Sequence, residues 1–128
     1  MPARVVVVHD DPAFVKQLVS ALRAAGHEVA AFADPLDAWG DLSTPQRIGV
    51  LITGVEFSPG RSNGVALALK ARTKRPKLHV LFTAQLELSQ ATAGLGTFME
   101  APVTVPAILS TVTRLLKFVD APLADAES

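Results

Sequence analysis

The sequence contains no cysteine, and its 12 basic residues are balanced by 12 acidic ones. Without cysteine the chain can form neither a disulfide nor a thiolate nucleophile nor a cysteine-ligated metal site, which fits a reducing cytoplasm. Because the net charge is zero, the chain has no overall electrostatic attraction to nucleic acids. The valine run at 5–8 is much shorter than a signal-peptide core or a membrane span. We therefore expect a cytoplasmic protein that binds neither nucleic acids nor membranes.

The sequence also lacks the patterns of a zinc site and of a nucleotide-binding loop. His9, His27 and His79 lack the spacing of metal ligands, so we expect no zinc site. The glycine-containing segment 60–64 lacks the lysine, and the serine or threonine after it, that a nucleotide-binding loop requires. No nucleophile and base pair can be assembled from the remaining residues, so we expect that the protein is not an enzyme.

Short β-branched runs alternate with longer segments of helical period along the 128 residues, which predicts one α/β domain with a parallel sheet. Right-handed crossovers then place helices on both faces of a five-stranded sheet, giving three layers. We expect this domain to occupy residues 1–119 and the acidic segment 120–128 to be a disordered tail. Strands are expected at Arg4–Val8, His27–Phe32, Ile48–Thr53, Leu78–Phe82 and Thr97–Met99. Helices are expected from Pro12 to Gly26 and at Leu36–Leu42, Val65–Thr73, Leu86–Ala93 and Val103–Val119.

The polar or small residues that follow the strands should gather at one edge of the sheet, because the carboxyl ends of parallel strands meet there and bind ligands in open α/β folds. These residues are His9, Asp10, Asp11, Gly54, Glu56, Thr83, Ala84, Ala101 and Pro102.

In order and spacing, these motifs resemble the receiver domain of bacterial two-component response regulators, over roughly residues 4–118. The resemblance implies a flavodoxin-like, doubly wound fold of five βα units and a role in signal transduction. It is carried by the valine run into His9-Asp10-Asp11-Pro12, by Gly26-His27-Glu28-Val29, by Val50-Leu51-Ile52-Thr53, by Gly64, by Thr83-Ala84 and by Pro102.

The resemblance also implies a phosphorylation site. In that family two acids after the first strand help to hold magnesium, an aspartate after the third strand accepts a phosphoryl group, and a hydroxyl and a lysine contact that group. By motif these five positions fall on His9, Asp10, Gly54, Thr83 and Ala101. A carboxylate attacks phosphorus only where cations neutralise the charge on the phosphoryl oxygens. Gly54 has no side chain and Ala101 has no ammonium, so we expect no phosphorylation here.

An alignment shifted by one residue would bring Thr53 to the acceptor position, and Thr53 also lacks a carboxylate. We therefore expect no phosphorylation with either alignment.

The remaining acids leave two interpretations open. Asp10 and Glu56, with Asp11 nearby, could bind Mg²⁺ weakly through oxygen ligands. Alternatively, Asp10 or Asp11 caps the first helix and Glu56 is solvated. His9 either titrates near neutral pH beside Asp10 or is a hydrogen-bonded substitute for the lost acid. The hydroxyl of Thr83 is expected to satisfy backbone groups at the end of its strand.

The family's signal is read through the fourth helix, the fifth strand and the fifth helix, where Phe98 matches an aromatic switch position. Because Phe98 lacks a hydroxyl, it should prefer an inward, apolar setting. We expect a pseudo-receiver that docks constitutively onto a protein partner, or onto a second copy of itself, through an apolar patch with Val105, Leu109 and Val112. The alternative is a small-molecule or ion sensor that uses the vacated acidic pocket.

Overall fold

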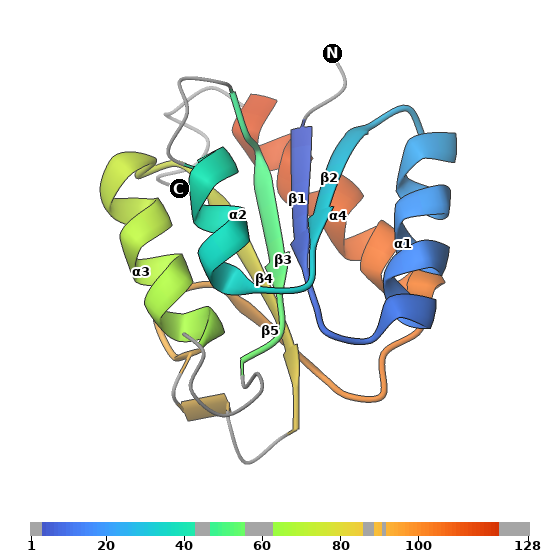
Figure 1. The fold of residues 1–128 in the computed structure, drawn as a ribbon. Helices are drawn as coiled ribbons and strands as arrows, with labels where there is room; N and C mark the ends of the chain where they lie inside the picture. Colours follow the sequence, from blue (N-terminus) through green and yellow to red (C-terminus); the bar gives the residue numbers. More distant parts are fainter. Residues whose placement is uncertain (1–3, 43–46, 56–62, 86–88, 91, 121–128) are drawn as a thin grey trace.

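A computed structural model describes residues 4–42, 47–55, 63–85, 89–90 and 92–120 of the chain. Five parallel strands form one sheet, as expected, and their order in the sheet is β2-β1-β3-β4-β5 (Figure 1). The strands are β1 (Arg4–Val8), β2 (Glu28–Phe32), β3 (Val50–Thr53), β4 (His79–Ala84) and β5 (Thr97–Glu100).

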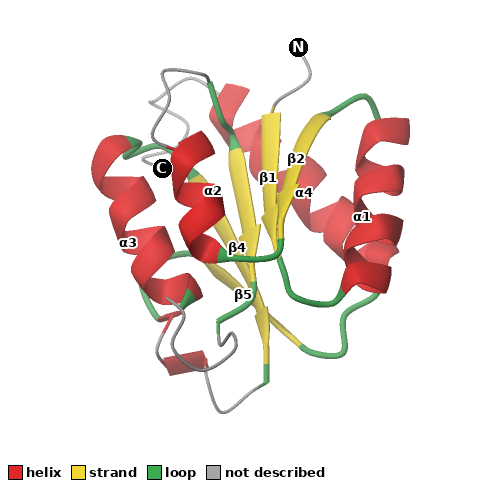
Figure 2. Cartoon of the chain, in the orientation of Figure 1, coloured by secondary structure: helices red, strands yellow, loops and turns green. Residues whose placement is uncertain are grey.

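Helices cover both faces of the sheet and complete the three predicted layers (Figure 2). They are α1 (Pro12–Ala24), α2 (Pro35–Leu42), α3 (Gly64–Lys74) and α4 (Val105–Asp120). On one face, α1 and α4 bury Leu18, Leu22 and Ile108 against the strands. On the other face, α2 and α3 bury Leu42 and Leu67. The doubly wound α/β fold is therefore confirmed.

The helix expected at Leu86–Ala93 is the main departure from the prediction. Residues 86–88 and 91 lie outside the described part, and the described residues 89, 90 and 92 form a 3₁₀ turn instead of an α-helix. The hydroxyl of Thr92 donates to Ser89 O at 2.8 Å within this turn. Gly94 follows with a φ of 80°, a conformation that ends helical structure. The segment has too few large apolar residues to hold a helix against the sheet.

The ends of several strands and helices also differ from the predicted ends by one or two residues. β2 begins at Glu28 and not at His27, and β3 begins at Val50 and not at Ile48. None of the described helices is long and apolar enough to cross a membrane. The expected disordered tail falls almost wholly at 121–128, outside the described residues, and stays a prediction.

Candidate functional site

The segment after β1 is organised around the start of α1. Asp11 is the N-cap of this helix, because its Oδ1 accepts from the backbone N–H groups of Ala13 and Phe14 at 3.1 and 3.3 Å. His9 Nδ1 in turn accepts from the backbone N–H of Asp11 at 3.1 Å. Of the two interpretations, helix capping is therefore confirmed for Asp11, and His9 is a hydrogen-bonded residue that supports the cap.

The charge of His9 is set mainly by its burial. Its ring is half-buried and packs against the ring of Phe14, with 4.8 Å between the centroids. Burial lowers the pKa of His9 below 6.5, and this effect outweighs the carboxylates of Asp10 and Asp11, which raise the pKa. Asp10 Oδ1 lies 3.8 Å from His9 Nδ1. Burial therefore favours the neutral form of His9, and the lowered pKa moves its titration away from neutral pH.

Gly54, where the resemblance places the phosphoacceptor, is fixed by hydrogen bonds of its own backbone. Its N–H donates to Val8 O at 3.1 Å, which continues the pairing of β3 with β1. The hydroxyl of the fully buried Thr53 donates to Gly54 O at 2.8 Å. The nearest hydroxyl is thus already engaged, and no carboxylate stands at this position.

The start of α3 packs directly against this backbone. Gly64 N–H donates to Val55 O at 2.8 Å. A Cβ at Gly64 would lie 1.8 Å from Gly54 O, which no side chain can occupy. Asn63 caps the helix by accepting from Ala66 N–H at 2.8 Å. The close approach of α3 to residue 54 therefore requires glycine at position 64.

Thr83 behaves differently from the prediction. Its side chain is buried at the end of β4, with 4% exposure, and its Oγ1 has no hydrogen-bond partner in the described part of the chain. The expectation that this hydroxyl satisfies backbone groups at the strand end is wrong. The nearby backbone is satisfied by main chain instead, since Ala84 O accepts from Ala101 N–H at 2.7 Å. A buried, unpaired hydroxyl therefore remains at this edge of the sheet.

The described residues do not fit a tight magnesium site. No group of three His, Asp or Glu side chains comes together among them. Asp11 Oδ1 serves the helix cap, Asp10 is exposed, and His9 replaces the first acid. Glu56 lies outside the described residues. A weak Mg²⁺ site at Asp10 and Glu56 therefore stays a prediction.

The predicted apolar docking patch is only partly available at the surface. Val112 is completely buried in the core between α1, α4 and the sheet, so its place in the patch is wrong. Its position in α4 points inward because it follows Ile108 by one helical turn. Val105 and Leu109 are half-buried against the same core. Phe98 is half-buried and packs against the opposite core, beneath α2 and α3.

We compared the chain with known families, curated proteins and solved structures, and only solved structures match it. No family model matches the sequence, and no curated protein matches it. Among solved structures, a CheY-like response regulator receiver domain protein from Methanospirillum hungatei JF-1 has 20% identity and a TM-score of 0.80, covering 91% of this chain and 95% of that chain. A response regulator receiver protein from Sinorhizobium medicae WSM419 has 21% identity and a TM-score of 0.81, with the same two coverages of 91% and 95%.

The receiver domain of the hybrid histidine kinase CckA is 27% identical, with a TM-score of 0.73, and the match covers 88% of this chain and 98% of that chain. The chain therefore has the fold of CheY-like receiver domains over nearly its whole length.

Proposed function

We propose that this chain is a pseudo-receiver of two-component signal transduction, which acts by binding a protein partner and does not depend on phosphorylation. The observation that carries the proposal is Gly54 at the end of β3, where the resemblance places the phosphoacceptor aspartate. A role in two-component signalling is supported by the receiver domains that share the fold.

The surroundings of Gly54 agree with a lost reaction. Phosphoryl transfer needs a nucleophile with cations around the transferring group. Here Ala101 stands at the lysine position, burial favours the neutral form of His9, and Thr53 Oγ1 donates to a backbone carbonyl. No described side chain supplies either the carboxylate or the fixed ammonium.

A protein partner is supported by how this fold is used elsewhere. A match to NtrX from Brucella abortus covers 27% of that chain, and a match to the response regulator DrrB of Thermotoga maritima covers 54%. In both, the fold is one part of a longer polypeptide. We propose that the partner, or a second copy, docks around the edge strand β5, where Phe98 lies on one face of the sheet and Val105 and Leu109 of α4 lie on the other.

Incubation with acetyl phosphate and Mg²⁺, followed by intact-mass spectrometry, tests the loss of phosphorylation. We expect no phosphoryl mass on the native chain. Gly54→Asp with Ala101→Lys restores the acceptor carboxylate and the lysine, and it is the matched variant. A stoichiometric phosphoryl group on the native chain would overturn the proposal.

A second candidate, a sensor of a small molecule, is favoured by the unpartnered hydroxyl of Thr83. A ligand that reaches this edge of the sheet would find a buried donor and acceptor without a partner. Thermal-shift screening separates the two candidates, because a ligand raises the melting temperature by binding the folded state. A hit that is lost in Thr83→Val supports the sensor, whereas a hit unchanged by this variant contradicts it.

A further inference from the structure

The edge strand β2 leaves part of its backbone unpaired by the sheet. It pairs only with β1, and Phe32 O accepts from His9 N–H at 3.1 Å on that side. Because successive residues of a strand direct their N–H and C=O groups to opposite sides, those of Val29 and Ala31 point away from the sheet. Arg23 agrees with this direction, since its Nη2 reaches over from α1 and donates to Val29 O at 3.2 Å.

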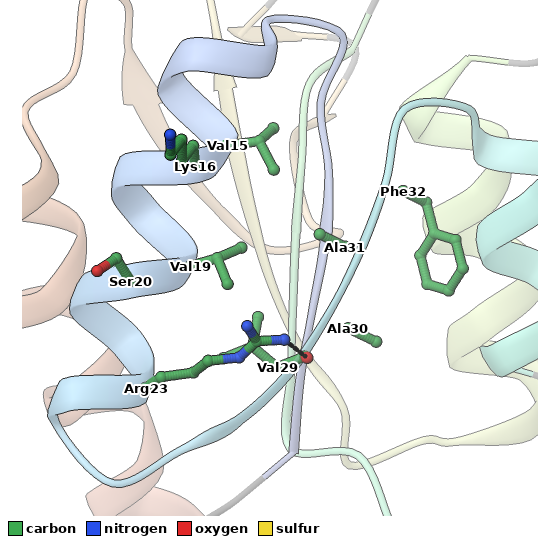
Figure 3. A pocket seen from close by; sticks show the side chains of 9 residues that line it. All are labelled: Val15, Lys16, Val19, Ser20, Arg23, Val29, Ala30, Ala31 and Phe32. Carbon is green, nitrogen blue, oxygen red and sulfur yellow. Dashed lines mark hydrogen bonds between the residues drawn. The ribbon is translucent and has the colours of Figure 1, made fainter.

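A groove of about 720 Å³ runs beside this edge, between β2 and α1 (Figure 3). Val15 and Val19 project toward the strand from α1, and Ala31 lies across from them on β2. Lys16 and Arg23 also line the groove, with Arg23 near Val29 and Lys16 in an earlier turn of α1. The groove therefore has an apolar wall of valine and alanine side chains, next to the polar Ser20 and the two cations.

Edge strands in proteins are normally protected from further pairing by a lysine, a proline or a bulge. β2 has no lysine, proline or bulge, and it pairs with β1 residue by residue. Its one charged residue, Glu28, is exposed at the first position and lies on the opposite face of the strand from Val29. Its small side chains at Ala30 and Ala31 leave room for a neighbouring strand. The edge is thus suited to accept one more strand.

The positive charges of Lys16 and Arg23 indicate which kind of chain can bind in the groove beside β2. If two copies paired antiparallel through β2, their α1 helices would also run antiparallel, and Lys16 of one copy would face Arg23 of the other. Like charges at both ends of the joint oppose such a dimer. An extended segment with carboxylates that reach Lys16 and Arg23, and an apolar side chain between them, matches the groove instead.

We propose that β2 and α1 bind an extended acidic segment of a protein partner, which adds to the sheet as a sixth strand. This site lies at the opposite edge of the sheet from β5, so it is separate from the surface proposed above and does not depend on the loss of phosphorylation.

The probe is a capped synthetic peptide, Thr-Glu-Thr-Val-Thr-Glu-Thr, in which both glutamates and the valine share one face of a strand. The control peptide carries lysine in place of both glutamates. In two-dimensional NMR of the isotope-labelled chain, we expect saturable shifts of the Val29 and Ala31 amides with the acidic peptide and weaker binding of the basic one. Reversing both cations, Lys16→Glu with Arg23→Glu, should invert this preference, with a change of up to about fivefold in dissociation constant for each charge.

Ala31→Pro isolates the backbone contribution, because it removes an N–H that points away from β1 and leaves the internal pairing intact. We expect it to weaken binding of the acidic peptide at least several-fold, whereas Ala31→Ser, which keeps the N–H, should not. Equal binding of both peptides, or no shift of the β2 amides, would overturn the proposal. So would β2 shifts that depend on protein concentration alone, which would indicate a second copy as the occupant.

Discussion

Replacing Thr83 by valine should stabilise the protein, because it removes an unpaired polar group from a buried site. Valine has nearly the shape of threonine and the same preference for strands, so the packing at the end of β4 is kept. An unpaired buried hydroxyl costs about 1–3 kcal/mol, and Thr83 Oγ1 has no partner in the described structure. We take the lower end of this range and expect Thr83→Val to raise the free energy of unfolding by about 1 kcal/mol.

Thr53→Val is the matched control, since Thr53 is equally buried and ends the neighbouring strand β3. Its hydroxyl donates to Gly54 O at 2.8 Å, so its removal should cost about 1 kcal/mol. The two variants make the same chemical change and should move stability in opposite directions. The hydrogen-bond partner alone distinguishes them.

Urea unfolding, followed by circular dichroism and by the fluorescence of the single tryptophan, measures both effects. With an m value of about 1.5 kcal/mol/M, a change of 1 kcal/mol moves the midpoint by about 0.7 M. The midpoint should rise for Thr83→Val and fall for Thr53→Val. If both variants lose stability equally, the hydroxyl of Thr83 has a partner in solution and the reasoning fails.

Three further perturbations follow from the same edge of the sheet. Gly64→Ala should cost several kcal/mol or prevent folding, because its Cβ would lie 1.8 Å from Gly54 O, and normal expression with an unchanged melting temperature would contradict this. Asp11→Ala should lose about 1 kcal/mol of the free energy of urea unfolding with the helix cap, whereas Asp10→Ala should change it by less than about 0.5 kcal/mol. Burial lowers the pKa of His9 in the folded state below 6.5, so the unfolded state binds more protons as the pH falls through this value, and stability decreases. Urea unfolding at about pH 7.5 and pH 5.5 should show a smaller loss of stability for His9→Asn than for the native chain, and an equal loss would exclude His9 as a source.

Much of the fold was predictable because its signals are local. The uninterrupted apolar run of β1 predicts a strand covered on both faces, and β1 is indeed buried between helices. The start of α1 is marked by two adjacent residues, because Asp11 caps the helix and Pro12 is its first residue. The absence of a side chain at Gly54 is likewise visible in the sequence, and it is the observation on which the proposed function depends.

The errors concern groups whose environment is assembled from distant segments. The sequence interpretation places Val112 at the surface, but Val112 follows Ile108 by one helical turn and is buried with it in the core between α1, α4 and the sheet. Thr83 was expected to find a backbone partner, yet Ala84 O pairs with Ala101 N–H and the hydroxyl is left without one. In the described part of the predicted helix at Leu86–Ala93, residues 89, 90 and 92 form a 3₁₀ turn, and the weak apolar pattern of this segment could not distinguish the two structures.

The sequence alone determined the class of fold, the start of α1 and the absence of a side chain at position 54, since these depend on residue type and on neighbours along the chain. Only the tertiary structure placed β2 at the edge of the sheet and set Lys16 and Arg23 of α1 beside the backbone groups of β2 that point away from β1. Strand order is decided by crossovers that join residues far apart in sequence. The composition of β2 therefore gives no sign that it is an edge, whereas its position in the folded sheet does.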